Sequence, residues 1–313
     1  MKISTIGEFG LINRIARKPN DKSIIVGIGD DAAVVKIGKK YVVCTTDTLI
    51  EGDHFSLEYY SPEQVGMKAI EVNVSDIGSM GAVPKYALIS LALRKGMDVA
   101  FVERLYKGMR SAAGKYGIEI IGGNTAHANQ IVIHVDLIGF LEIKKLKLRS
   151  MAKPGDFILV SGDLGGSAAG LNLLKNNIPG HAKTKKRHLE PKAKFHKVRP
   201  FLRYINAMQD ISDGLASEIT HVCSQSKVGA LLFADNVPIK EETRQAALVV
   251  KKDALLYALY GGEDFELIYT VSEKNLNKVR GYLIGEITSK KDIMMYRNGK
   301  NIPLRKRGYD HFA

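Results

Sequence analysis

Strand-like and helix-like segments alternate along the first half of the chain. Runs rich in apolar and β-branched residues predict strands at 24–26, 41–46, 86–93, 118–121 and 131–141, and amphipathic stretches predict helices at 6–15, 62–80 and 99–116. The helix after Ser61 is the best defined, because this serine, Pro62 and Gln64 form a capping box with proline at the first helical position. The alternation therefore predicts an α/β arrangement for this half.

A turn signal near residue 150 separates this half from the rest. The basic run 144–149 gives way to Lys153-Pro154-Gly155-Asp156, and a strand-like run follows at 157–160. The second half repeats the mixed pattern, with helices expected at 167–174 and around 217–223 and strands near Leu231, Ile268 and Met294. Since 313 residues favour two domains over one, we predict α/β domains with mixed sheets at 1–150 and 151–313.

The net charge of +13 is concentrated in one segment. Between residues 183 and 203, nine Lys or Arg residues accompany the single acid Glu190. Such a run is more typical of a solvated connector and helix face than of a polyanion site. Nucleic acid is therefore an unlikely partner, although a basic nucleic-acid-binding protein without catalytic activity stays open as an alternative.

Neither a membrane segment nor a disulfide framework is indicated. The start of the chain lacks the continuous apolar run of a secretory signal, and the most apolar stretch, 131–141, is well short of the roughly 20 residues that cross a bilayer. Cys44 and Cys223 are far apart and belong to no CxxC pair. We therefore expect a cytoplasmic protein without a membrane partner.

Aspartates recur in glycine- or hydroxyl-rich segments, which we expect to be turns. They stand in Gly29-Asp30-Asp31-Ala32, Thr45-Thr46-Asp47-Thr48, Asn73-Val74-Ser75-Asp76 and Asp210-Ile211-Ser212-Asp213-Gly214. One aspartate in a turn usually satisfies local backbone, but four such groups are harder to explain in this way. Carboxylate and hydroxyl oxygens suit Mg²⁺, and a polyphosphate beside carboxylates requires cations between them. The pattern therefore predicts a magnesium-held polyphosphate site.

Other nucleotide-binding motifs do not fit. Residues 27–32 match GxGxxA superficially, but they place two acids where a pyrophosphate needs bare backbone N–H groups. The chain contains no GxxxxGK[ST], HExxH or GxSxG sequence. The backbone of Gly122-Gly123-Asn124-Thr125 could approach a phosphate closely. The segment Gly261-Gly262-Glu263-Asp264 places paired acids just before a strand. Either segment could also be an ordinary turn.

Taken together, these segments resemble the thiamine-monophosphate kinase family, whose superfamily also contains aminoimidazole ribonucleotide synthetase, selenophosphate synthetase and the hydrogenase maturation factor. The match begins at Gly7-Glu8-Phe9 and spans nearly the whole chain. The segment from Asp47 to Phe55 and the terminal Gly308-Tyr309-Asp310-His311-Phe312 separate this family from its relatives. The resemblance implies ATP-dependent phosphorylation of thiamine monophosphate to thiamine diphosphate by a cytoplasmic homodimer, paired through the sheets of its N-terminal domains.

The resemblance also implies the residues of the site. Magnesium ligands would be Asp31, Thr45, Thr46, Asp47, Asp76, Asp210 and Asp213, to which we add Asp30 and Asn124. ATP would contact Gly123, Asn124, Arg149 and Ser212, and thiamine monophosphate would contact His54, Glu263 and Tyr309. No catalytic base is assigned, because the acceptor phosphate is already anionic and in-line transfer depends on positioning and charge neutralisation.

One departure from the family concerns its GGDT pattern, because this chain has Asn124 in place of the aspartate. The family aspartate is a magnesium ligand, whereas Asn124 offers a neutral oxygen. We expect that metal to bind more weakly here unless another acid compensates. A different ATP-dependent activity of the same superfamily stays open as a further alternative.

Overall fold

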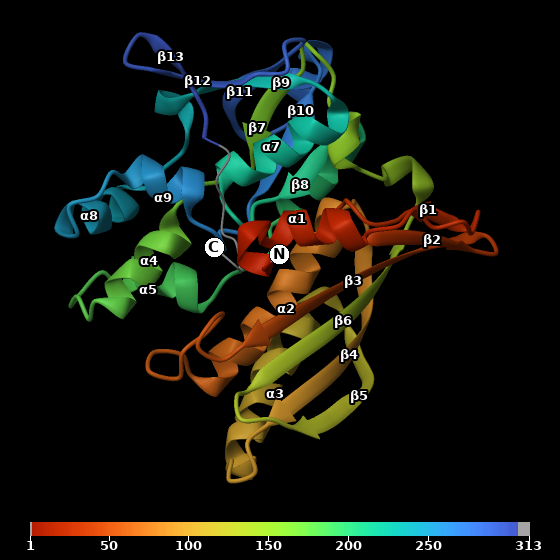
Figure 1. The fold of residues 1–313 in the computed structure, drawn as a ribbon, viewed down its shortest axis with the longest axis vertical. Coiled ribbons are helices and arrows are strands. Elements are labelled where there is room, and N and C mark those ends of the chain that lie inside the picture. The colour runs from red at the N-terminus through yellow and green to blue at the C-terminus, as the bar shows by residue number, and fades with distance from the viewer. Residues whose placement is uncertain (1, 306–313) are drawn as a thin grey trace.

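The computed structural model describes residues 2–305 and contains two mixed sheets, one in each half of the chain (Figure 1). The first sheet has the strand order β1-β2-β3-β6-β4-β5 and the second β13-β12-β9-β11-β7-β10-β8. Only the pairs β4–β5 and β9–β12 are parallel in the described residues. The predicted mixed α/β class is therefore confirmed. The domain boundary at residue 150 falls between the two sheets and stays a prediction.

Elements of the first half lie close to their expected positions. The strands are β1 Ile24–Val26, β2 Ala33–Ile37, β3 Lys40–Ile50, β4 Val83–Leu93, β5 Glu119–His127 and β6 Val132–Leu141, and the helices are α1 Gly7–Ile15, α2 Pro62–Ser79 and α3 Val99–Tyr116. The capping box at Ser61 is present, with both of its hydrogen bonds. Strand β2 was not foreseen.

The second half adds seven strands and six α-helices to the described part of the chain. The strands are β7 Phe157–Val160, β8 Met208–Asp210, β9 Gly229–Phe233, β10 Leu267–Val271, β11 Tyr282–Thr288, β12 Ile293–Arg297 and β13 Lys300–Pro303. The helices are α4 Gly166–Lys175, α5 Ala182–Leu189, α6 Phe195–Val198, α7 Leu215–Ser226, α8 Glu241–Val249 and α9 Ala254–Tyr260. Short 3-10 helices lie at Ile3–Thr5, Ile143–Lys145, Arg149–Met151, Arg199–Tyr204, Ala234–Asn236 and Glu273–Lys278. The expectation that the strand near Met294 is the last was wrong, because β13 pairs with it.

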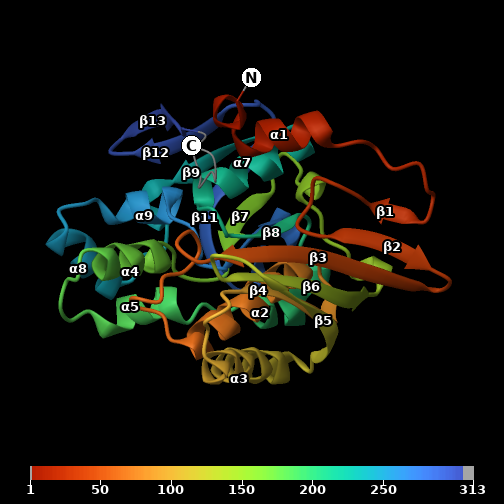
Figure 2. The same cartoon turned by 60° about the horizontal axis from the view of Figure 1, so that its bottom comes forward.

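Helices α2 and α3 cover one face of the first sheet, with α2 against the strands (Figure 2). Two glycines allow their backbones to touch. A Cβ on Gly66 of α2 would lie 2.0 Å from the carbonyl oxygen of Leu105, and one on Gly108 of α3 would lie 2.0 Å from that of Glu63. Side chains at these two positions would therefore force the helices apart.

Helix α2 also carries a row of polar residues that faces the second half of the chain. This polar stripe of α2 consists of Gln64, Lys68, Glu71 and Ser75, whose spacing places them on one side of a helix. Each of the four has a polar partner in the second half, in the same order Glu190, Glu263, the backbone N–H of Ala193, and Asp210. The stripe therefore joins the two halves by polar contacts. No helix among residues 2–305 is both long and apolar enough to span a membrane.

Candidate active site

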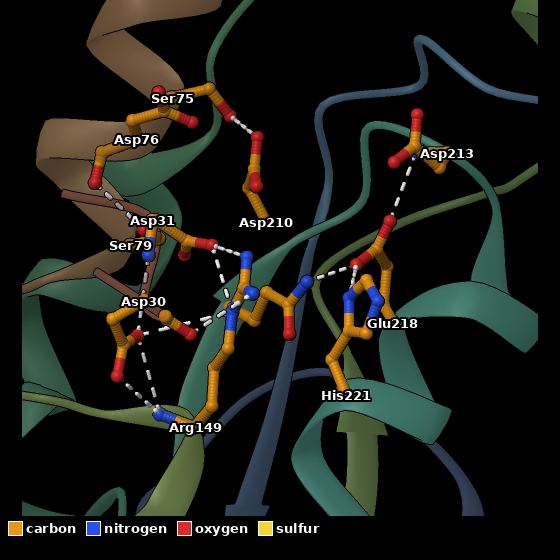
Figure 3. Close-up of polar contacts among 12 residues, drawn as sticks. Asp30, Asp31, Ser75, Asp76, Ser79, Arg149, Asp210, Asp213, Glu218 and His221 are labelled. Carbon is orange, nitrogen blue, oxygen red and sulfur yellow. Dashed lines mark hydrogen bonds and ion pairs between the residues drawn. The ribbon is translucent and has the colours of Figure 1, made fainter. Parts of the chain in front are cut away.

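Six of the predicted aspartates lie where the two halves meet. They are Asp30 and Asp31 between β1 and β2, Asp47 on β3, Asp76 on α2, Asp210 at the end of β8, and Asp213 in the turn before α7. Figure 3 shows all of these except Asp47 around the side chain of Arg149. The expectation of turns was wrong for Asp47 and Asp76, which stand within a strand and a helix. Asp76 accepts a hydrogen bond from Thr45 rather than from local backbone.

Hydroxyl groups hold two carboxylates of this cluster, Asp76 and Asp210. Thr45 Oγ1 donates to Asp76 Oδ2 at 2.6 Å and to the backbone carbonyl of Asp31 at 3.3 Å. Ser75 Oγ donates to Asp210 Oδ2 at 2.6 Å, and this bond connects the first half to the second. Strand β3 and helix α2 thus supply donors as well as acids to the same site.

Burial and mutual repulsion make several of these carboxyl groups weak acids. Burial, and then the charges of Asp47, Asp210 and Asp31, raise the pKa of Asp76 well above its ordinary value. Burial and the charge of Asp31 likewise raise the pKa of Asp210 well above normal. For Asp47, burial raises the pKa to about 6 against the opposing effect of His134.

Arg149 binds the aspartates of the β1–β2 loop. Its backbone N–H lies 3.3 Å from Asp30 Oδ2, its Nε lies 3.2 Å from Asp31 Oδ1, and its Nη2 contacts the same oxygen of Asp31. The pKa of Asp30 nevertheless rises to about 7, because burial and the charge of Asp31 outweigh Arg149. The arginine side chain is 16% exposed, so part of its donor surface can reach a ligand.

Asp213 borders the cluster next to a buried acid that the sequence did not single out. Glu218 Oε1 accepts from the backbone N–H of Asp213 at 2.9 Å, and its Oε2 accepts from Gln209 and lies 3.4 Å from His221 Nδ1. Burial, and then Glu218 and Glu8, raise the pKa of Asp213 to about 8. Glu218 therefore fixes the turn that presents Asp213.

Two predicted ligands do not join this cluster within one chain. Thr46 is exposed on the opposite face of β3 from Thr45, and its Oγ1 lies 3.0 Å from His134 Nε2. Asn124 is exposed on β5, the edge strand of the first sheet. The geometry thus separates these two residues from the aspartates that surround Arg149.

The glycine segment beside Asn124 is neither a turn nor the end of a strand. Strand β5 runs through it, and Gly123 pairs with Ile89 of β4. A Cβ on Gly123 would lie 1.7 Å from the carbonyl oxygen of Ile89. We expected a strand at 118–121 followed by a loop, but β5 continues through the glycines to His127. The close approach of β4 requires a residue without a side chain at this position.

The donor set fits a hard divalent cation, although the ligands are not yet assembled. Among residues 2–305 no three His, Cys, Asp or Glu side chains already form a ligand group, because hydroxyls and Arg149 hold the individual carboxylates. Asp31 Oδ2, however, is buried and has no hydrogen-bond partner in the described chain. Oxygen-only donors with raised pKa values suit Mg²⁺, which competes with their protons.

The predicted substrate residues form a second group near the same junction. Lys68 contacts both of its described members, donating to the backbone carbonyl of His54 at 2.7 Å and forming an ion pair with Glu263 Oε1. The backbone N–H of Glu263 donates to the carbonyl of Ser212 at 2.6 Å, which places the predicted ATP residue Ser212 beside it. Tyr309 lies outside the described residues.

The basic segment 183–203 is not simply a solvated connector. Arg187 pairs with Asp163 at 2.6 Å and lies 3.7 Å from Asp264. Lys197 pairs with Glu266 at 2.9 Å. The expectation of a solvated face was wrong for these cations, because they neutralise acids that are buried around the Glu263 segment. This use of the charge counts against the nucleic-acid alternative.

Comparison with known proteins places this geometry in a family. Models of the AIR synthase related protein match residues 29–141 (N-terminal domain) and 153–297 (C-terminal domain). The thiamine-monophosphate kinase of Aquifex aeolicus (strain VF5) is 38% identical over 317 residues, covering 100% of both chains. That of Bacillus subtilis (strain 168) is 36% identical, covering 97% of this chain and 99% of the other. The chain belongs to the thiamine-monophosphate kinase family.

A solved structure supports the assignment. AaThiL complexed with AMPPCP and TMP matches with a TM-score of 0.90 and 37% identity, covering 99% of each chain. Membership of the kinase family confirms the expectation drawn from the motifs. Lys68, Glu218 and the contacts of the basic segment are features of this family member that motif comparison missed. For Lys68, the one available signal was a lysine within the helix predicted after Ser61.

Proposed function

We propose that this family member transfers the terminal phosphoryl group of ATP to thiamine monophosphate and forms thiamine diphosphate. The observation that carries the proposal is the convergence of Asp30, Asp31, Asp47, Asp76, Asp210 and Asp213 on one junction. The substrate residues His54 and Glu263 meet at the same junction through Lys68. A cluster of acids beside a second group of polar residues suits two phosphorylated ligands that react with each other.

The proposed cofactor is Mg²⁺, held by oxygen donors from both halves. Its ligands are drawn from Asp30, Asp31, Thr45, Asp47, Asp76, Asp210 and Asp213, with Thr46 and Asn124 as predicted contributors. When bound, the metal neutralises charge on the phosphate oxygens during transfer. The orphaned, buried Asp31 Oδ2 supports this proposal most directly.

The protein's own groups orient the reactants. Arg149 presents a planar guanidinium that is 16% exposed, and its remaining N–H groups can donate to a phosphate in a fixed geometry that a lysine lacks. Ser212 and Gly123 are the further predicted ATP contacts. No residue is needed as a general base, because the acceptor oxygen of thiamine monophosphate carries negative charge at neutral pH. The rate therefore depends on alignment and on charge neutralisation.

We further propose that the enzyme is a homodimer. Strand β5 is exposed along most of its length at the edge of the first sheet, and it displays the apolar side chain of Ile121. Asn124 on this strand and Thr46 on β3 are exposed and do not reach the aspartates of their own chain. Light scattering should give twice the mass of one chain. The cytoplasmic location stays a prediction.

The activity is tested with the purified protein, ATP, magnesium and thiamine monophosphate. Formation of thiamine diphosphate and ADP in equal amounts is expected, with no ADP formed when the acceptor is omitted. A parallel panel with selenide and a purine-pathway ribonucleotide separates the superfamily alternatives. ATP consumption with one of these acceptors, and none with thiamine monophosphate, would overturn the proposal.

A further inference from the structure

A fully buried lysine joins the two segments predicted to hold thiamine monophosphate. Lys68 has 0% of its side chain exposed. Its Nζ donates to the carbonyl oxygen of His54 at 2.7 Å and pairs with Glu263 Oε1, and it lies 5.5 Å from the ring centre of Tyr60. A buried ammonium persists only when it is paired and hydrogen-bonded in this way. The three contacts therefore define one position for the Nζ atom.

The backbone around Glu263 is held in an uncommon conformation. Its φ is +67°, a region that side chains other than glycine rarely adopt. The hydrogen bond from its N–H to Ser212 holds it there, and a Cβ on the preceding Gly262 would lie 2.3 Å from the same carbonyl oxygen. Strain of this kind persists when the surroundings over-determine the residue, and it is often associated with function. Here it directs the carboxylate toward Lys68.

The second carboxylate oxygen of Glu263 is also fixed. His188 Nδ1 lies 3.2 Å from Oε2, and Tyr60 anchors the histidine by donating to its backbone carbonyl at 2.9 Å. Burial lowers the pKa of His188, so the ring is neutral near pH 7 and does not add charge. Although burial favours the protonated acid, Lys68 and His188 lower the pKa of Glu263 to about 2. Glu263 is therefore always a hydrogen-bond acceptor at working pH.

The charges also determine what Glu263 can recognise. Because Lys68 cancels its charge, the pair offers little net attraction to a cationic ligand. The carboxylate is still 28% exposed, and its oxygens can each accept more than one hydrogen bond. Recognition then depends on the direction of these free lone pairs, which can accept a hydrogen bond from an N–H group of the substrate heterocycle.

We propose that Lys68 is a positioning residue for thiamine monophosphate, which orients Glu263 without touching the substrate. This inference rests on the proposed function. Lys68 also stands eight residues before the metal-site residue Asp76 on the same helix, a separation of about 12 Å along the axis. Helix α2 thereby sets the distance between the substrate carboxylate and the aspartate cluster.

The test is a double-mutant cycle measured as binding of thiamine monophosphate by calorimetry, with magnesium present. We expect Lys68→Met and Glu263→Gln each to weaken binding by about 10- to 100-fold. The double variant should bind no more weakly than Glu263→Gln alone, because Lys68 acts through Glu263. Lys68→Arg, which keeps the charge, should recover part of the affinity. Binding of a non-hydrolysable ATP analogue should change less than about twofold in each variant.

The matched control is Lys197→Met. Lys197 pairs with buried Glu266 at 2.9 Å, only three residues from Glu263 on the same segment. This variant breaks a comparable ion pair without moving the substrate carboxylate. Its affinity for thiamine monophosphate should equal that of the wild type.

The possible outcomes separate the two proposals. Absence of thiamine monophosphate binding by the wild type would overturn the proposed function, and this inference with it. Wild-type affinity in folded Lys68→Met, or additive losses in the double variant, would overturn only the inference. If Lys68→Met does not fold, the double variant, which leaves no buried unpaired charge at the pair, is compared with Glu263→Gln. Weaker binding by the double variant would then contradict the proposal.

Discussion

Ser75 donates a 2.6 Å hydrogen bond to Asp210, and this contact places a helix of the first half directly against a strand end of the second. Asp210 is 2% exposed, so the bond satisfies an acceptor that water reaches poorly. Asp76, the next residue on the helix, accepts a hydrogen bond from Thr45 of the first half instead. Adjacent residues of α2 thus bind partners from different halves, and the acidic cluster forms between them.

Asp76→Asn should remove turnover while the fold is retained, and Asp47→Asn should do the same. We expect kcat to fall at least about 100-fold, because each change deletes a charged oxygen donor from the cluster rather than an apolar core group. Steady-state kinetics and circular dichroism measure the two properties. The control is Asp235→Asn, a change at an exposed aspartate outside the cluster. Near-normal activity in either cluster variant would reject the shared metal site.

The stability of the metal-free protein should fall as the pH rises from about 4 to about 8. The pKa values of Asp30 and Asp213 are raised to about 7 and about 8, chiefly by burial. In this pH range the folded chain holds protons that the unfolded chain has released near pH 3.8, so raising the pH favours unfolding. The contribution of these protons to the free energy of unfolding is complete below pH 3.8. It is lost as the pH rises through the folded pKa values of about 7 and about 8.

Magnesium should reduce this pH dependence, because a bound cation replaces the protons on the same oxygens. Calorimetric Tm values at pH 5, 6.5 and 8, measured with and without magnesium, provide the comparison. A Tm that rises across this range without magnesium, or one that magnesium leaves unchanged at pH 8, would contradict the expected metal site.

Asn124→Asp should lower the magnesium concentration at which the reaction reaches half of its maximal rate. The residue is exposed on β5, so the substitution restores a charged ligand without disturbing packing. A magnesium titration of the rate should shift to lower concentration, whereas Asn124→Ala, the control, should shift it to higher concentration or leave it unchanged. An unaltered titration for Asn124→Asp would mean that this position does not meet the metal.

Two glycines of α3 should respond to alanine with opposite signs. Gly108→Ala places a methyl group against the backbone of α2 and should lower the free energy of unfolding by about 1 to 3 kcal/mol. At Gly114 a Cβ would find no atom within 4 Å, so alanine there should raise that free energy by up to about 1 kcal/mol. Urea denaturation measures both. Equal effects would show that the helices do not touch at Gly108.

The sequence alone was most informative where local signals are strong. The helix at 99–116 and the strands at 24–26 and 157–160 appear with the bounds expected from their periodicity. Strand β8 was missed because its three residues carry little periodic signal and depend on pairing with β10. The glycines of β5 were expected after the end of a strand, either near a phosphate or in an ordinary turn, because their close contact with β4 cannot be seen in the sequence.

Long-range contacts account for what the sequence could not reveal about the site. The motifs identified the aspartates, and the structure brings those from distant segments together. No local pattern could join Lys68 to Glu263, which is almost 200 residues further along the chain. The division of Thr45 and Thr46 between opposite faces of β3 also became visible only with the sheet in place.

The polar stripe of α2 has a consequence for how the protein unfolds. Lys68 and Glu71 are almost completely buried, yet their partners Glu263 and Ala193 come from the other half. A chain severed near residue 150 would leave the buried ammonium of Lys68 without a carboxylate partner. Glu71 would lose the N–H of Ala193 but keep its contacts with Lys115 and Tyr116. The two sheets are therefore separate in architecture but cooperative in stability, and they should melt in a single transition.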